Sequence, residues 1–178
     1  SSDRPTTKKL SNVPYRFGEV RQSGDENIIV IPAISSENRE YLPCGILPSG
    51  SIISNKCYAL FNAPIWNLAI ISTRLHWLWI ATVCVRMRTD FSYSNTLGWN
   101  TFYVPKLTEK NMLDLTRSAE EILLAREIHF PKTIAELYDP ERMPKNLINA
   151  HKQNDEILER IYIGRQFKND TERLEKLF

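Results

Sequence analysis

Residues 72–105 read STRLHWLWIATVCVRMRTDFSYSNTLGWNTFYVP, and their pattern decides how the chain is expected to fold. In the first part of this stretch, Leu75, Leu78 and Trp79 recur at a spacing of three to four residues. This period is typical of a helix with an apolar face, and the neighbouring apolar residues widen that face. We therefore expect a buried helix over about residues 73–86, followed by an exposed turn.

The segments at the two ends of this helix also follow from local sequence. Ser72 or Thr73 can accept a hydrogen bond from a free amide group of the first turn and so cap the helix. Beyond the helix, residues 91–104 are rich in aromatic and polar side chains. We expect extended structure there, with a turn at Ser94-Asn95-Thr96.

The charged residues after the helix are the strongest candidates for a binding function. Arg88 and Asp90 are two positions apart, which places a fork of hydrogen-bond donors beside an acceptor on a protruding turn. An Arg side chain can bond guanine at two atoms of its major-groove edge, and Asp can accept from the amino group of cytosine. The pair could thus read one base pair; the alternative is a surface ion pair.

If the Arg88–Asp90 pair reads a base pair, other polar side chains in the first part of the chain are candidates for contacts to the DNA backbone or groove. An Arg near a helix start can share a phosphate with the free amide groups there, and an Arg at a helix end can hold one by itself. The alternative for both is a solvated side chain at a helix end. Arg39 can either contact phosphate or fix its own loop. The tentative contacts are Arg39, Arg74, Arg86, Tyr93, Ser94 and Asn95.

Four motifs occur in a fixed order, at residues 35–43 (SSENREYLP), 72–79 (STRLHWLW), 85–94 (VRMRTDFSYS) and 99–105 (WNTFYVP). In order and spacing they resemble the target-recognition domain of MmeI-like (type IIL) restriction-modification enzymes. The resemblance continues into the C-terminal helices and covers nearly the whole chain. The chain departs from the family pattern at Val85, where Gly is frequent, and at Ser92, where an Arg is frequent and is expected to contact DNA.

The resemblance implies a function for the chain and for its parent protein. Enzymes of this family join a nuclease, an adenine methyltransferase and a DNA-reading domain in one polypeptide. The resemblance places Arg88 and Asp90 where the family reads a base pair, so the expected function is sequence-specific recognition of double-stranded DNA. The expected partners are the DNA duplex and the methyltransferase domain of the parent chain, which would bind S-adenosylmethionine elsewhere and methylate adenine, with or without an endonuclease.

No catalytic residue, cofactor site or metal site is expected in this chain itself. It has no Gly-rich loop after a strand, no Asn/Asp-Pro-Pro-Tyr tetrapeptide and no P-loop. A nuclease site built from Asp25 and residues 37–39 would lack the Lys that such sites use. The histidines, His76, His129 and His151, are far apart in the sequence, and the cysteines are not paired in spacing.

Composition limits which classes of protein this chain can belong to. The net charge of +2 over 178 residues does not by itself indicate nucleic-acid binding. Three cysteines without a CxxC pair suggest reduced thiols in the cytoplasm. The apolar residues 66–85 contain Asn, Arg and His, which favours a protein core over a membrane span. Because the sequence begins Ser-Ser-Asp-Arg without Met, it is interpreted as a piece of a larger protein.

The expected architecture is α+β, with a change of character after Pro105. Residues 1–105 are interpreted as the C-terminal portion of a target-recognition domain, with strands at about 27–32 and 52–60 and a helix at about 64–71. Residues 106–178 are interpreted as a helical subdomain that packs on the first part. The alternative function is a protein-interaction or subunit-contact module, favoured if a broad apolar patch surrounds Arg88.

The expected helices of the second part follow from cap residues. Thr108 can cap the first of them, Thr133 and Glu136 have the spacing of a capping box, and Asn169 and Glu172 repeat that spacing. Between these boxes, Pro144 suits the start of a longer helix that runs to about Ile163, with Gly164 as its stop.

Overall fold

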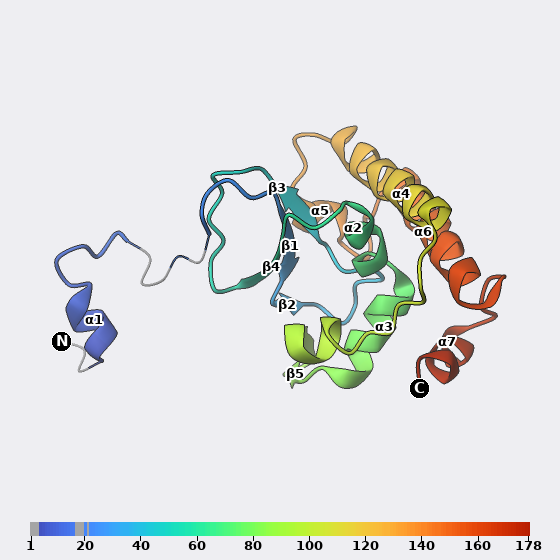
Figure 1. Ribbon diagram of the computed structural model, residues 1–178, viewed down its shortest axis with the longest axis horizontal. Coiled ribbons are helices and arrows are strands. Elements are labelled where there is room, and N and C mark those ends of the chain that lie inside the picture. Colours follow the sequence, from blue (N-terminus) through green and yellow to red (C-terminus); the bar gives the residue numbers. More distant parts are fainter. Residues whose placement is uncertain (1–3, 17–19, 21) are drawn as a thin grey trace.

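The structure, a computed structural model, describes residues 4–16, 20 and 22–178. Two small antiparallel sheets lie beside a group of helices that form most of the body (Figure 1). A short helix, α1 (Pro5–Lys9), lies apart from this body. The arrangement confirms the expected α+β class.

The first sheet has strand β1 (Ile28–Pro32) at its centre, between β3 (Gly45–Leu47) and β4 (Cys57–Phe61). Both pairings are antiparallel. The strand expected at 27–32 is therefore confirmed. The strand expected from residue 52 begins five residues later, because residues 54–57 form a turn in which the Ser54 hydroxyl and carbonyl accept from the amides of Lys56 and Cys57.

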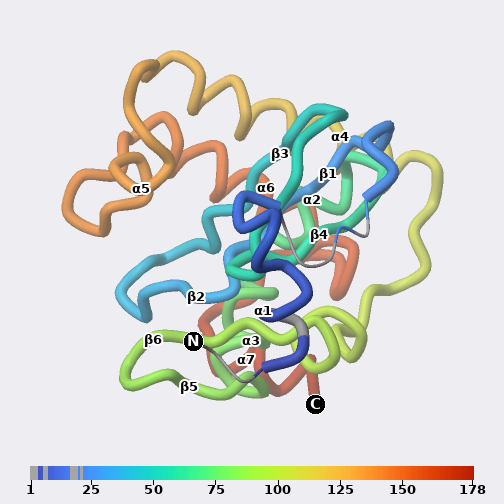
Figure 2. Tube along the Cα trace, turned by 90° about the vertical axis from the view of Figure 1, so that its left-hand side faces the viewer, coloured from blue at the N-terminus to red at the C-terminus, as the bar shows by residue number. Residues whose placement is uncertain are grey.

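The second sheet carries the charged turn. Strand β6 (Asp90–Ser92) pairs with β5 (Arg86–Met87) on one side and with β2 (Ile34–Ser35) on the other. The β5–β6 pair is a hairpin that projects from one corner of the molecule (Figure 2). The segment around Ser35 therefore supports the hairpin although it is more than fifty residues away in the sequence.

Two helices connect the sheets. Helix α2 (Trp66–Ile71) is buried along most of its length, and α3 (Arg74–Val83) follows it directly. The Thr73 hydroxyl accepts from the amide of His76, which confirms one of the two expected caps. Helix α3 ends a turn earlier than expected, so the hairpin strands begin immediately after it.

A π-helical turn, η1 (Asn95–Trp99), replaces the extended structure expected after the hairpin. The Ser94 hydroxyl caps this turn by accepting from the amide of Leu97. Gly98 then approaches α3 so closely that a Cβ atom there would lie 3.2 Å from the Ile80 side chain. The turn forms because this one residue without a side chain lets the backbone pack against the helix.

The second part of the chain is helical, as expected. Its first helix starts after Thr108, whose hydroxyl accepts from Asn111, and Thr133 and Glu136 form a complete capping box. Gly164 ends the helix that follows Pro144, with a φ of 78°, a conformation that favours glycine. The four helices are α4 (Glu109–Glu127), α5 (Ile134–Leu137), α6 (Lys145–Ile163) and α7 (Asp170–Leu177).

One apolar core runs through both parts of the chain. Leu68 and Ile71 of α2 are fully buried in the same cluster as Leu115 of α4 and Leu158 of α6. The helical part thus packs on the first part, as expected, and each part buries its apolar side chains against the other. Among the described residues, no helix combines the length and the apolar character that a bilayer span requires.

A buried polar network reinforces this contact. Arg126 of α4 donates to the Cys44 carbonyl at 2.6 Å and to the Tyr138 hydroxyl at 2.9 Å. That hydroxyl lies 2.7 Å from Nε2 of His151, whose Nδ1 lies 3.0 Å from the Ser72 carbonyl. Because buried polar groups without partners are costly, these bonds fix how the helical part sits against the start of α3.

Candidate nucleic-acid interface

The hairpin tip places Arg88 and Asp90 in the positions that the sequence predicts. Met87 and Asp90 form the last strand pair, so the turn consists of Arg88 and Thr89 alone. The Arg88 side chain is exposed, and that of Asp90 is half-buried. Within the described part of the chain, neither side chain makes a hydrogen bond or an ion pair, and the surface ion pair considered above is not formed. Both groups are therefore available to a ligand.

The backbone at Arg88 is unusual. Its φ is +62°, in the left-handed region that favours glycine. Two-residue hairpin turns commonly place Gly or Asn where φ is positive. A bulky residue there costs conformational energy, and this exposed side chain gains no packing in return. Strained residues of this kind cluster at functional sites, which singles out Arg88 as a candidate contact.

Arg86 is held by its own hairpin and by a distant loop. Its Nη1 lies 2.6 Å from a carboxylate oxygen of Glu37 and 3.4 Å from the Thr89 carbonyl. The guanidinium also lies over the ring of Phe91, 4.5 Å from the centroid. The sequence predicts a phosphate contact for this residue, whereas the structure shows Arg86 supporting the turn.

Arg39 likewise has partners within the chain. Its Nε donates to the Tyr138 carbonyl at 3.3 Å, and its Nη1 lies 3.5 Å from the Ser35 hydroxyl. Of the two roles predicted for Arg39, the structure favours the one that fixes its own loop. Through Tyr138, this loop is tied to the helical part of the chain.

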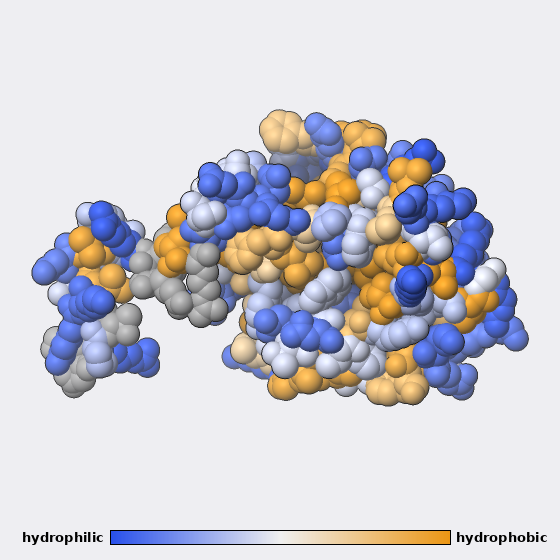
Figure 3. Space-filling model, in the orientation of Figure 1, coloured by the Kyte–Doolittle hydropathy of each residue, from blue (hydrophilic) through white to orange (hydrophobic). Residues whose placement is uncertain are grey.

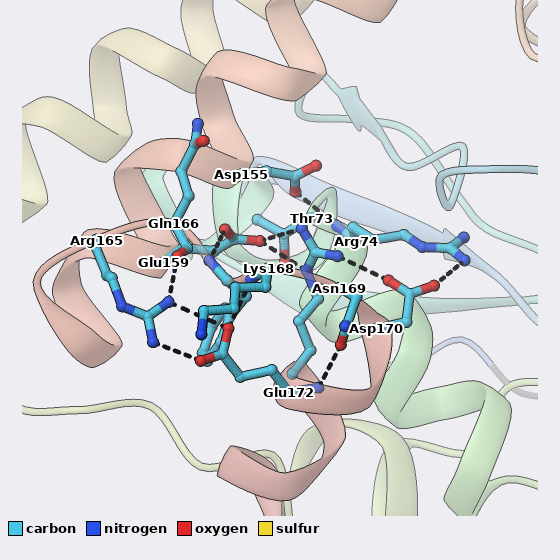
Figure 4. Close-up of polar contacts among 12 residues, drawn as sticks. Thr73, Arg74, Asp155, Glu159, Arg165, Gln166, Lys168, Asn169, Asp170 and Glu172 are labelled. Atoms are coloured by element: carbon cyan, nitrogen blue, oxygen red, sulfur yellow. Dashed lines mark hydrogen bonds and ion pairs between the residues drawn. The ribbon is translucent and has the colours of Figure 1, made fainter.

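Arg74 and the start of α3 are also occupied. The Arg74 guanidinium forms an ion pair with Asp170 at 2.8 Å (Figure 4). The guanidinium also lies over the Trp77 ring. The Arg74 amide, which is the free amide group that could meet a phosphate, donates instead to Asp155 at 2.7 Å. A carboxylate of α6 thus takes the place at this helix start that the prediction gives to DNA.

Asp155 is buried, and its environment is not that of a surface carboxylate. Burial raises its pKa to about 7, although the Arg74 amide and the Tyr41 hydroxyl both donate to it and favour the charged form. Burial also raises the pKa of Tyr41, together with the negative charge of Asp155. This carboxylate therefore joins α6 to the start of the helix that leads to the hairpin.

The remaining predicted contacts lie on or near η1, and they differ in accessibility. Tyr93 is buried, and its hydroxyl lies 3.2 Å from Nε2 of His76, so the backbone or groove contact expected of it stays a prediction that this burial does not favour. Ser94 uses its hydroxyl as a cap. Asn95 is exposed, although its side-chain oxygen accepts from the amide of Thr96. Of these three, Asn95 is the most exposed, and Ser94 is half-buried.

The sequence predictions did not include two residues that organise this region. Glu37 was considered only for a metal site with Asp25, and its pairing with Arg86 spans 49 positions. Asp155 lies in a helix whose sequence shows no pattern typical of a catalytic or binding site. The position of Glu37 within the SSENREYLP motif was the one sequence feature that could have indicated its role. No sequence feature indicated the role of Asp155. Within the described ranges, no cluster of three or more His, Cys, Asp or Glu side chains could hold a metal ion.

The surface around the tip mixes charge with apolar side chains. Val85 and Met87, which precede and follow Arg86 in the sequence, are 71% and 55% exposed. A larger apolar surface lies elsewhere, over the end of α4 and the connection to α5 (Figure 3). Exposed apolar side chains thus occur both at the hairpin and at this second surface.

Comparisons with known proteins agree with this arrangement. The sequence profile of the family described as "MmeI, target recognition domain" matches residues 1–106, and that of "MmeI, C-terminal domain" matches residues 107–178. DNA methyltransferase A of Bacillus subtilis (strain 168) is 40% identical over 171 residues, which are 96% of this chain and 19% of that protein. The chain thus spans about a fifth of this curated relative.

A solved structure points to the same family. The type IIL restriction-modification enzyme MmeI, determined in complex with DNA, matches 100% of this chain and 24% of its own. The TM-score is 0.90 at 30% sequence identity. The chain belongs to the MmeI target-recognition-domain family and continues into the C-terminal domain of the same family.

Proposed function

We propose that this chain selects the DNA sequence on which a longer DNA methyltransferase of a restriction-modification system acts. The support comes from three sources: membership of the MmeI target-recognition-domain family, a relative named as a DNA methyltransferase, and a matching enzyme that was solved with DNA. In this proposal double-stranded DNA is the partner, and the rest of the parent polypeptide carries the chemistry.

The observation that carries the proposal is the free pair of side chains on the projecting hairpin. A two-stranded ribbon fits the major groove of B-DNA, where each base pair presents a distinct pattern of donors and acceptors. Arg88 would donate two hydrogen bonds to guanine, and Asp90 would accept from its paired cytosine. Val85 and Met87 would supply apolar contacts at the groove wall.

The proposal also assigns the cofactor and the methylation step to the rest of the parent polypeptide. The parent would bind S-adenosylmethionine outside this chain and methylate the amine of an adenine flipped out of the duplex, in the cytoplasm. The chain alone would neither bind the cofactor nor cut DNA. Micromolar affinity for S-adenosylmethionine in calorimetry of the isolated chain would contradict this division.

The decisive experiment exchanges the two charges in the parent enzyme. The double variant Arg88→Glu with Asp90→Arg should change the preferred base at one position of the target and leave the other positions intact. Mapping of methylated sites on random-sequence DNA measures this. An unchanged motif in an active double variant would show that the pair does not read DNA.

A second candidate function rests on the apolar surface away from the hairpin. An apolar groove of about 730 Å³ lies between the first sheet and the α4–α5 connection. Beside it, Ile128 and Phe130 are 75% and 87% exposed. This surface lies on the opposite edge of the molecule from the hairpin (Figure 1), so a protein contact there is compatible with DNA at the tip.

A further inference from the structure

We propose that Glu37 is a positioning residue for base reading, because it holds Arg86 and thereby fixes the orientation of the Arg88–Thr89 turn. This inference rests on the proposed function. It assigns a part in sequence selection to a residue that lies outside the hairpin and is not expected to touch a base.

The first step of the argument is how little else supports the hairpin tip. Strand β5 has two residues, both exposed, and β6 has three, of which only Phe91 is buried. Two-stranded hairpins of this length are marginally stable by themselves. Strand β2 pairs with β6 only opposite Phe91 and Ser92, so the orientation of the tip beyond these residues is set by side-chain contacts to the body of the protein.

Arg86 supplies those contacts in three directions. It faces Phe91 across the hairpin, and its guanidinium lies over that ring. One nitrogen, Nη1, donates both to the Thr89 carbonyl in the turn and to the carboxylate of Glu37. The guanidinium therefore links the turn, the buried side chain of β6 and the distant loop.

Glu37 is a suitable anchor because its own loop is fixed. Ser35 pairs with Phe91 in the second sheet, which places the loop beside the hairpin. The Ser36 carbonyl accepts from the Arg39 amide at 3.2 Å, which closes a turn around Glu37. Arg39 then reaches the Tyr138 carbonyl in the helical part. A continuous set of contacts thus runs from that part to the tip.

The pair is suited to positioning more than to stability. The side chains of Arg86 and Glu37 are 48% and 35% exposed, and an ion pair this accessible contributes little to the free energy of folding. The charge of the pair matters more for the orientation of the turn, because a Glu37 carboxylate that is not paired with Arg86 would face the DNA phosphates. Loss of the pair should therefore leave folding intact and loosen the reading of one base pair.

The test compares Glu37→Gln with Glu40→Gln in the parent enzyme. Both changes remove one negative charge from the same loop, but the Glu40 carboxylate makes no hydrogen bond or ion pair in the described structure. Glu37→Gln should reduce discrimination about fivefold at the base pair read by Arg88 and Asp90, and at no other position. The control should retain the wild-type selectivity, and both variants should unfold at the wild-type temperature.

A double-variant cycle with Arg86→Gln separates positioning from a phosphate contact. If Glu37 acts through Arg86, the double variant should be no less selective than Arg86→Gln alone. If Arg86 instead holds phosphate, its loss should weaken binding to all sequences alike, and Glu37→Gln should not lower selectivity. That second result overturns the inference, as does a Glu37→Gln protein that melts several degrees lower.

The experiment also distinguishes this inference from the proposed function. An exchange of Arg88 and Asp90 that shifts the target, with Glu37→Gln unchanged in selectivity, removes only the positioning role. An exchange that leaves the target unchanged removes the base-reading role itself.

Discussion

Arg88 has a backbone conformation that glycine would adopt with less strain, and its side chain makes no hydrogen bond or ion pair in the described structure. We expect Arg88→Gly to stabilise the isolated chain by about 1 kcal/mol, because the strain at φ +62° is released. The same change should remove about 1–3 kcal/mol of base discrimination in the parent enzyme. Chemical denaturation and methylation-site mapping measure the two effects.

The neighbouring residue provides the control for this prediction. Thr89 has no positive φ, so Thr89→Gly should destabilise the chain through the added freedom of the unfolded state. If both glycine variants lose stability equally, the turn at Arg88 is not strained.

Arg39 and Arg74 differ from Arg88 because both have partners within the chain. Both guanidinium groups bond within the chain, so Arg39→Gln and Arg74→Gln should each lower the free energy of unfolding by about 1 kcal/mol. The slope of log affinity against log salt should stay unchanged, because no phosphate contact is removed. A slope that falls by about one in either variant would restore the phosphate contact that the sequence predicts.

Among the elements, those defined by local chemistry were predicted from the sequence. Thr73, Thr108 and Gly164 begin or end helices as expected, because a cap depends only on a few neighbouring residues. The turn with Arg88 and Asp90 was found for the same reason. The contacts of Glu37 and Asp155 could not be predicted, since their partners lie 49 and 81 positions away.

The π-helical turn η1 was missed because it depends on packing. Gly98→Ala should destabilise the chain by about 1–3 kcal/mol, since the new methyl group would lie 3.2–3.3 Å from the side chains of Ile80, Cys84 and Tyr93. Gly45→Ala serves as the control, because its methyl group would meet Val30 at an ordinary 3.5 Å. Thermal unfolding of the two variants measures the difference, and equal melting temperatures would contradict the close packing of η1.

At the scale of the whole molecule, three buried groups set the response to pH. Burial lowers the pKa of His76 and of His151 to about 3, with Arg126 adding to the effect at His151. The unfolded chain therefore binds more protons between pH 3 and 6.5, and these histidines make the free energy of unfolding fall on acidification. Asp155 has a raised pKa of about 7, so on acidification the folded chain binds this proton at a higher pH than the unfolded chain does. This group therefore raises the free energy of unfolding as the pH falls.

Two histidines outweigh one carboxylate, so stability should fall as the pH is lowered from 7 to 5. In Asp155→Asn the opposing contribution is absent, and the fall over this range should be steeper. Denaturation curves collected at several pH values test both statements. A wild-type curve that is flat from pH 7 to 5 would show that the histidines are not buried in neutral form.

The core shared by α2, α4 and α6 bears on how this chain can be inherited. Leu68 and Ile71 pack in one cluster with Leu115 and Leu158, across the point between residues 106 and 107 where the two family descriptions meet. A recombination event at that point would set side chains from two lineages against each other along the whole contact. We therefore expect the two segments to be inherited together when genes are exchanged between strains.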